Sequence, residues 1–102
     1  MIHVIATITV KPGKRDAFLA EFHRVVPDVL AEDGCLAYGP AIDTPSGIPV
    51  QPALRQDVVV VIEQWSDLAA LRLHLEAPHM AAYRERVKDL VAGVQLQVLQ
   101  PA

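Results

Sequence analysis

In the first third of the chain, the spacing of hydrophobic residues changes from every second position to that of a helix. Residues 2–10 alternate between more apolar and more polar positions, a period of two that is typical of a β-strand. Residues 14–32 then carry apolar side chains at helical spacing, which predicts an amphipathic helix. Pro27 lies inside this segment. We expect it to kink or break the helix, because its ring displaces the carbonyl group one turn earlier.

The middle of the chain predicts two strands separated by an irregular stretch. Gly34 is placed to end the helix, and Cys35 to Asp43 reads as a second strand. Thr44 to Arg55 contains several prolines and cannot form a regular element. Its length favours a lid or a partner-contacting loop as much as a plain surface excursion. Asp57 to Trp65 is the clearest strand, because its β-branched run is apolar on both faces, and we expect it near the centre of a sheet.

The last third predicts a broken helix and a final strand. Ser66 or Asp67 can cap a helix with an inner stripe of Leu68, Leu71 and Leu75. Pro78 suits the first position of a further helical segment. The expected inner side of that segment is Met80, Tyr83, Val87, Leu90 and Val91. After Gly93, the apolar positions Val94, Leu96 and Val98 alternate with glutamines, as expected for a last strand.

This order of elements, β-α-β-β-α-β with the second helix broken, predicts an α+β fold of the ferredoxin-like type. One antiparallel sheet would carry both helices on one face, within a single domain over residues 1–102. The other face would be uncovered and partly apolar, with Ile5, Thr7, Val60, Ile62, Gln64 and Leu99. Such a face is too apolar for a stable monomer, so we expect a homodimer in which two sheets pack face to face.

Composition and charge narrow the class of protein. The chain is 52% hydrophobic with a net charge of −3, and its basic residues are interleaved with acidic ones, so no nucleic-acid partner is expected. The longest apolar run, Val58 to Ile62, is far shorter than the roughly 20 residues of a membrane span. The N-terminus lacks the charged region of a signal peptide. Cys35 is the only cysteine and cannot form an internal disulfide, which fits a cytoplasmic location.

Candidate reactive side chains gather between Glu63 and Tyr83. Glu63 and Trp65 share the strand face that should lie beneath the helices. A buried carboxylate there must be paired, for example with Arg72 or Arg84, or its pKa must shift. Trp65 can either pack in the core or stack against a flat aromatic ligand.

Histidine and tyrosine side chains offer further chemistry. His74 can sit at the edge of the inner stripe, where a neutral imidazole accepts a proton, although a satisfied structural histidine fits equally. His79, Tyr38 and Tyr83 are candidates for substrate contacts, with helix capping or packing as the alternative roles. His74 and His79 are five positions apart with a proline between them, which disfavours a metal site on one helical face. No glycine-rich loop offers a seat for a nucleotide cofactor.

Four segments carry a resemblance to a known family: VIATI, GCLAYGPAID, VVVIEQWSDLAALRLHLEAPHMAAY and QLQVLQP. They resemble the antibiotic biosynthesis monooxygenase superfamily, and most of all its bacterial quinol monooxygenases. The resemblance implies a dimeric α+β barrel, with a pocket between each sheet and its own helices. It also implies oxygen chemistry without metal, flavin or haem. Haem-degrading relatives carry an asparagine where this chain has Ala6, and their iron-binding histidine has no counterpart beyond His79, so haem degradation is disfavoured.

The resemblance and the residues together predict an enzyme without a cofactor that uses O₂ to oxidise a quinol, such as menadiol, or a related phenol to a quinone. In this hypothesis His74, Trp65 and Glu63 are the catalytic residues, and Tyr38, His79 and Tyr83 bind the substrate. Two alternatives stay open at this point. One is a non-catalytic dimer that binds quinones or similar aromatics, and the other is an isomerase of small signal molecules on the same fold.

Overall fold

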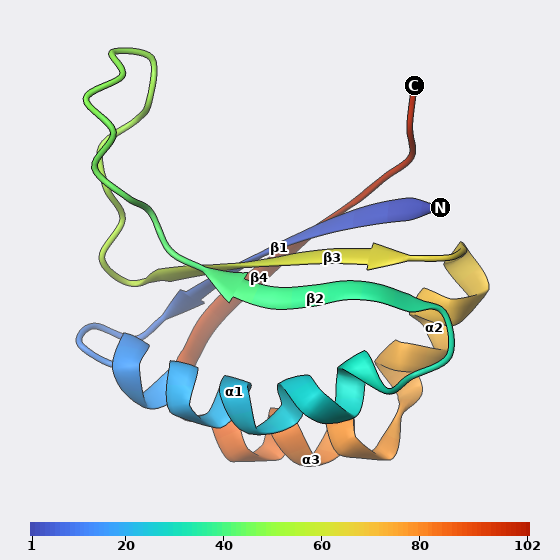
Figure 1. Cartoon of the computed structure of the whole chain (residues 1–102). Coiled ribbons are helices and arrows are strands. Elements are labelled where there is room, and N and C mark those ends of the chain that lie inside the picture. The colour runs from blue at the N-terminus through green and yellow to red at the C-terminus, as the bar shows by residue number, and fades with distance from the viewer.

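The chain folds into one antiparallel sheet with three helices on one of its faces, in a computed structural model that describes all 102 residues (Figure 1). The elements follow the order β1 (Ile2–Val10), α1 (Arg15–Leu30), β2 (Cys35–Ala41), β3 (Val58–Trp65), α2 (Leu68–Glu76), α3 (Pro78–Val87) and β4 (Val91–Leu99). The strand order in the sheet is β2-β3-β1-β4. The predicted ferredoxin-like α+β fold is therefore confirmed.

The sheet register places alternate residues of each strand beneath the helices. Val4 pairs with Glu63, and Ala6 pairs with Val61, so these residues point to the same face. The largest core side chains lie between that face and the helices, namely Trp65, Phe18, Phe22, Leu71, Val4, Val10, Val25, Val29, Val59 and Val61. The opposite face stays uncovered. At its centre Ile62 pairs with Ile5 and is 49% exposed.

Helix α1 runs through Pro27 to Leu30, so the expected break at Pro27 is wrong. Pro27 and His23 both lie on the exposed side of the helix. The carbonyl group that loses its partner to the proline can therefore bind water instead of being buried without a hydrogen bond.

Helix α2 begins where the sequence predicts, but its buried residues differ from the predicted ones. The Asp67 side chain accepts a hydrogen bond from the Ala70 N–H and caps the helix. The buried residues are Ala70, Leu71 and His74, whereas the expected inner residues Leu68 and Leu75 are exposed. The helix is thus rotated toward its histidine, because His74 finds a buried polar partner that satisfies its ring.

The end of the chain also departs from the sequence prediction. Helix α3 buries Met80, Tyr83 and Val87 as expected, but it ends at Val87. Leu90 and Val91 therefore lie beyond the helix, and β4 begins at Val91 rather than after Gly93. The helix-side residues Val94 and Leu96 of β4 remain exposed, because they border the cavity described below instead of packing against a helix.

The segment between β2 and β3 forms no regular element apart from turns, as the prolines predict. It projects beyond one end of the sheet, away from the helices (Figure 1). The two ends of this segment are joined by Arg55, which donates two side-chain hydrogen bonds to the Asp43 carboxylate at 2.8 and 2.9 Å. This segment lies outside the cavity described below.

None of the helices is both long enough and apolar enough to cross a membrane.

Candidate active site

A cavity of about 380 Å³ lies between the helices and the covered face of the sheet. Its wall is mostly apolar, and the polar or charged side chains in it are few. Those side chains are Tyr38, Glu63, His74, Tyr83, Arg84 and Lys88. Cavities of this size and character are typical of sites for small molecules.

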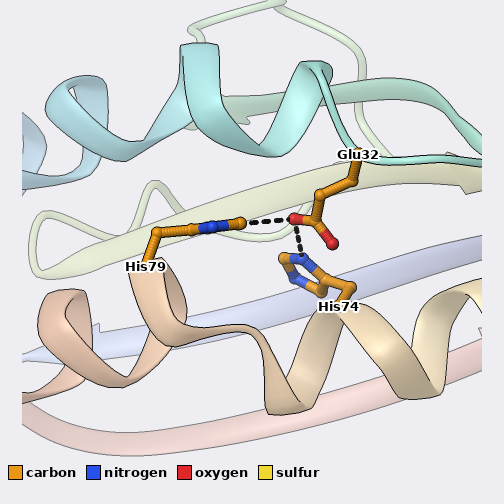
Figure 2. Close-up of side chains that lie close together, drawn as sticks. All are labelled: Glu32, His74 and His79. Atoms are coloured by element: carbon orange, nitrogen blue, oxygen red, sulfur yellow. Dashed lines mark hydrogen bonds and ion pairs between the residues drawn. The ribbon is translucent and has the colours of Figure 1, made fainter.

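His74 is the most enclosed polar side chain of the cavity wall, with 2% of its surface exposed. Its Nδ1 atom lies 2.8 Å from Oε2 of Glu32. Glu32 follows α1 in the turn that leads to β2, so α1, α2 and the turn together fix the imidazole (Figure 2). Because a carboxylate oxygen only accepts hydrogen bonds, the His74 Nδ1 must carry the proton, which leaves Nε2 with a free lone pair.

The same oxygen of Glu32 also engages His79, whose Nε2 lies 2.8 Å away. His79 is the second residue of α3, and it is 27% exposed. It does not line the cavity. The predicted substrate-binding residue therefore contacts Glu32 from outside the cavity, and substrate contact by His79 has no support from its position.

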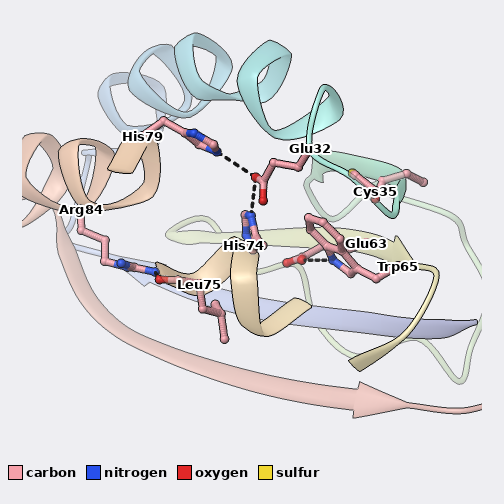
Figure 3. Close-up of polar contacts among 9 residues, drawn as sticks. Glu32, Cys35, Glu63, Trp65, His74, Leu75, His79 and Arg84 are labelled. Atoms are coloured by element: carbon pink, nitrogen blue, oxygen red, sulfur yellow. Dashed lines mark hydrogen bonds and ion pairs between the residues drawn. The ribbon is translucent and has the colours of Figure 1, made fainter. Parts of the chain in front are cut away.

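Trp65 and Glu63 lie side by side on β3, beneath the helices (Figure 3). The Trp65 indole N–H donates to Oε1 of Glu63 at 2.9 Å. Neither arginine considered as a partner for Glu63 takes that role, and Arg84 instead donates to the Leu75 carbonyl. Trp65 is fully buried and does not line the cavity. Its ring packs against His74 with centroids 4.7 Å apart, so it holds the imidazole from behind.

Tyr38 and Tyr83 both line the cavity. The Tyr38 ring lies edge-on to His74, with 5.3 Å between centroids, and Tyr83 packs edge-on against Phe22. Burial raises the pKa of both phenols above the ordinary value. Both hydroxyls therefore keep their protons at neutral pH and can donate hydrogen bonds.

Burial moves the two titrating groups of the site in opposite directions. It raises the pKa of Glu63 to about 7, against the opposing effect of the Trp65 N–H and with a smaller contribution from the charge of Glu32. Burial lowers the pKa of His74, although the hydrogen bond that its ring donates to Glu32 acts the other way. At neutral pH the imidazole is therefore uncharged and Glu63 is partly protonated, a pairing that suits proton transfer.

Lys88 and Glu32 are the polar members of the site that the sequence pattern did not reveal, and Glu32 is the one that contacts His74. It lies just past the C-terminus of α1, where a negative charge faces the negative end of the helix dipole. An acid at that position is unfavourable without a partner. That mismatch is the signal in the sequence that could have pointed to Glu32.

The family model for antibiotic biosynthesis monooxygenase matches residues 1–86. The chain belongs to the antibiotic biosynthesis monooxygenase family. Membership supports a monooxygenase activity and agrees with the resemblance found in the sequence.

Individual proteins resemble the chain over nearly its whole length. A protein of Escherichia coli K12 named probable quinol monooxygenase YgiN is 44% identical over 103 residues, covering 99% of this chain and 98% of that protein. The crystal structure of PA3566 from Pseudomonas aeruginosa is 30% identical, with a TM-score of 0.80, and the match covers 99% of this chain and 93% of PA3566. Rv0793 from Mycobacterium tuberculosis is 27% identical, with a TM-score of 0.80, over 99% of this chain and 94% of Rv0793.

Proposed function

We propose that the chain is a cofactor-independent monooxygenase or oxidase that uses O₂ to oxidise a quinol, or a related phenolic aromatic, to a quinone. The observation that carries the proposal is the position of His74, a neutral imidazole in the wall of an apolar cavity with Glu32 behind it. The name of the E. coli relative supports the same class of substrate.

The first step is removal of a proton from the substrate. A phenol of the tyrosine type holds its proton until pH about 10, and neutral quinols react slowly with O₂. The Nε2 lone pair of His74 takes a phenolic proton, and the Glu32 carboxylate stabilises the imidazolium that forms. Trp65 keeps the ring in place from behind.

The second requirement is stabilisation of the quinolate oxygen. The Trp65 N–H is already bonded to Glu63, so Trp65 has no N–H left to bind the quinolate oxygen. Tyr38 and Tyr83 line the cavity with protonated hydroxyls, and the protonated fraction of Glu63 is a further donor. Arg84 and Lys88 add positive charge in the cavity wall. Donors and cations fixed in an apolar cavity stabilise an anion strongly.

The electron-rich quinolate then reduces O₂. In the oxidase form the quinol loses two electrons and two protons, O₂ accepts them, and the products are a quinone and H₂O₂. In the monooxygenase form one oxygen atom enters the ring, the other leaves as water, and the product is a hydroxylated quinone. The chain itself supplies proton transfer, orientation and electrostatic stabilisation in either form.

The test compares His74→Ala with wild type in the aerobic oxidation of a naphthoquinol such as menadiol. We expect kcat/KM to fall at least tenfold, because loss of a general base typically costs 100-fold or more, about 3 kcal/mol. His23→Ala is the matched control, since His23 is an exposed histidine of α1 away from the cavity. Far-UV circular dichroism checks that both variants fold. An unchanged rate in His74→Ala would remove the imidazole from the proposed role.

The same assay separates the alternatives. More than one quinol consumed per chain excludes a module that only binds aromatics. Conversion of the substrate without O₂ would favour an isomerase instead.

The proposal includes a homodimer in the cytoplasm. Face-to-face packing of two sheets would bury the open face around Ile62, which is apolar at its centre and half exposed in the single chain.

A further inference from the structure

Three potential metal ligands converge on one point beside the cavity (Figure 2). Glu32 comes from the turn after α1, His74 from α2 and His79 from the start of α3. Oε2 of Glu32, Nδ1 of His74 and Nε2 of His79 all lie within 4.8 Å of one another. The local spacing of the two histidines disfavours a metal site on one helical face, but Glu32, the third group, lies more than 40 positions away in the chain.

The separations are close to those of a metal centre. Zinc lies about 2.0–2.2 Å from imidazole nitrogen and carboxylate oxygen, so the ligand atoms of a tetrahedral site are about 3.3 Å apart. Each nitrogen is already 2.8 Å from the shared oxygen. A bound ion would therefore require side-chain shifts of about 1 Å, with no rearrangement of the helices.

The ligand types select a class of ion. Two imidazole nitrogens and one carboxylate oxygen suit Zn²⁺, Co²⁺ and Ni²⁺, whereas Mg²⁺ and Ca²⁺ prefer sites built from oxygen alone. The carboxylate brings a negative charge to the site. His79 is 27% exposed, so an ion can reach the site from solvent and keep water at its fourth position.

We propose that Glu32, His74 and His79 form a binding site for one divalent transition-metal ion such as Zn²⁺, with a fourth position open to solvent. The two ring protons that now face Glu32 move to the other ring nitrogens or leave when the ion binds. The simpler alternative is that Glu32 only orients the two rings, and binding measurements separate the two.

Metal binding has a consequence that rests on the proposed function. A neutral imidazole has one free lone pair, so an ion on Nδ1 of His74 places the ring proton on Nε2. The nitrogen proposed to accept the substrate proton is then occupied. Zn²⁺ should accordingly act as a reversible inhibitor of quinol oxidation and not as a cofactor.

The test is isothermal titration calorimetry of the chelator-treated full chain with ZnCl₂. A separate metal-free sample is titrated with CoCl₂ and followed by visible absorption. We expect one Zn²⁺ per chain with a Kd below about 10 µM, and Co²⁺ bands typical of four-coordinate nitrogen and oxygen ligation. His79→Ala should weaken Zn²⁺ binding at least tenfold, Glu32→Gln should do the same, and His23→Ala should bind as wild type does. Millimolar Mg²⁺ should not compete.

Absence of Zn²⁺ binding would overturn the metal site, and so would binding of equal strength in His79→Ala. Neither result depends on catalysis, because the readout is binding alone. A protein that binds Zn²⁺ but does not oxidise quinols would keep the metal site and refute the proposed function. A protein that oxidises quinols without binding Zn²⁺ would support the proposed function and refute the metal site.

Discussion

Glu63→Gln offers a quantitative test of the buried carboxyl group in the cavity wall. Glutamine has nearly the same shape and keeps an oxygen to accept the Trp65 N–H, so the variant removes the ionisation and little else. Glu63 is 5% exposed. The groups that face it are the Trp65 indole, its cross-strand neighbour Tyr38, the more distant carboxylate of Glu32, and His74 on the helix above.

The magnitude follows from the pKa of Glu63, which burial raises from 4.5 to about 7. Because the folded state holds this proton more tightly than the unfolded chain, the contribution of Glu63 to stability is complete below pH 4.5 and is lost as the pH rises through 7. At about 1.4 kcal/mol per pH unit, the loss amounts to about 3 kcal/mol by pH 8. Glutamine does not titrate, so Glu63→Gln should gain about 3 kcal/mol over wild type between pH 4.5 and pH 8.

The assay is urea unfolding of both proteins at a fixed protein concentration, at several pH values from 4.5 to 8. The difference between the two free energies of unfolding cancels the other titrating groups, which are common to both proteins. Glu76→Gln is the control for the substitution itself, since Glu76 is exposed on α2 and the variant keeps the buried carboxyl group of Glu63. A difference for Glu63→Gln that is flat over this range would refute the raised pKa and the role of Glu63 as a proton-bearing donor.

Two further predictions concern the turn that presents Glu32 and the open face of the sheet. Gly34 has φ of +81°, and a Cβ there would lie 2.7 Å from that of Ala70, so Gly34→Ala should cost about 3 kcal/mol of unfolding free energy in urea titration. Gly13→Ala has a similar φ with open space around it and should cost only about 1 kcal/mol; equal costs would contradict the steric account. If the chain forms the proposed dimer, Ile62→Lys should convert it to a monomer in light scattering, whereas Leu73→Lys, on the exposed side of α2, should not; a wild-type monomer at micromolar concentration would refute the proposed dimer.

The sequence predicted the fold well because the hydrophobic periods are long and clear. The alternation in β1 and the β-branched run in β3 define the strands that pair at the centre of the sheet. The predictions from the sequence fail where the tertiary structure overrides a local preference. Pro27 removes one hydrogen bond of α1, but on this exposed side of the helix the freed carbonyl group can bind water, and the helix continues.

The site was predicted in part, for a related reason. His74, Glu63, Tyr38 and Tyr83 were expected to lie in or near the pocket, and all four line the cavity. Glu32 was missed because its partners come from two other helices, and the local sequence shows only an acid at an unfavourable helix end without naming its partners. The rotation of α2 that buries His74 instead of Leu75 depends on the same contact, since the imidazole can be buried only where a polar partner meets it.

In the proposed function the chain itself, without a bound metal or organic cofactor, passes electrons from a quinol to O₂. The most direct test is O₂ uptake by chelator-treated protein in the presence of excess menadiol, measured with an oxygen electrode alongside H₂O₂ and product analysis. We predict uptake well above the buffer rate, with more than one O₂ consumed per chain. Uptake no faster than in buffer, or uptake that stops at one equivalent, would refute quinol oxidation by the chain alone.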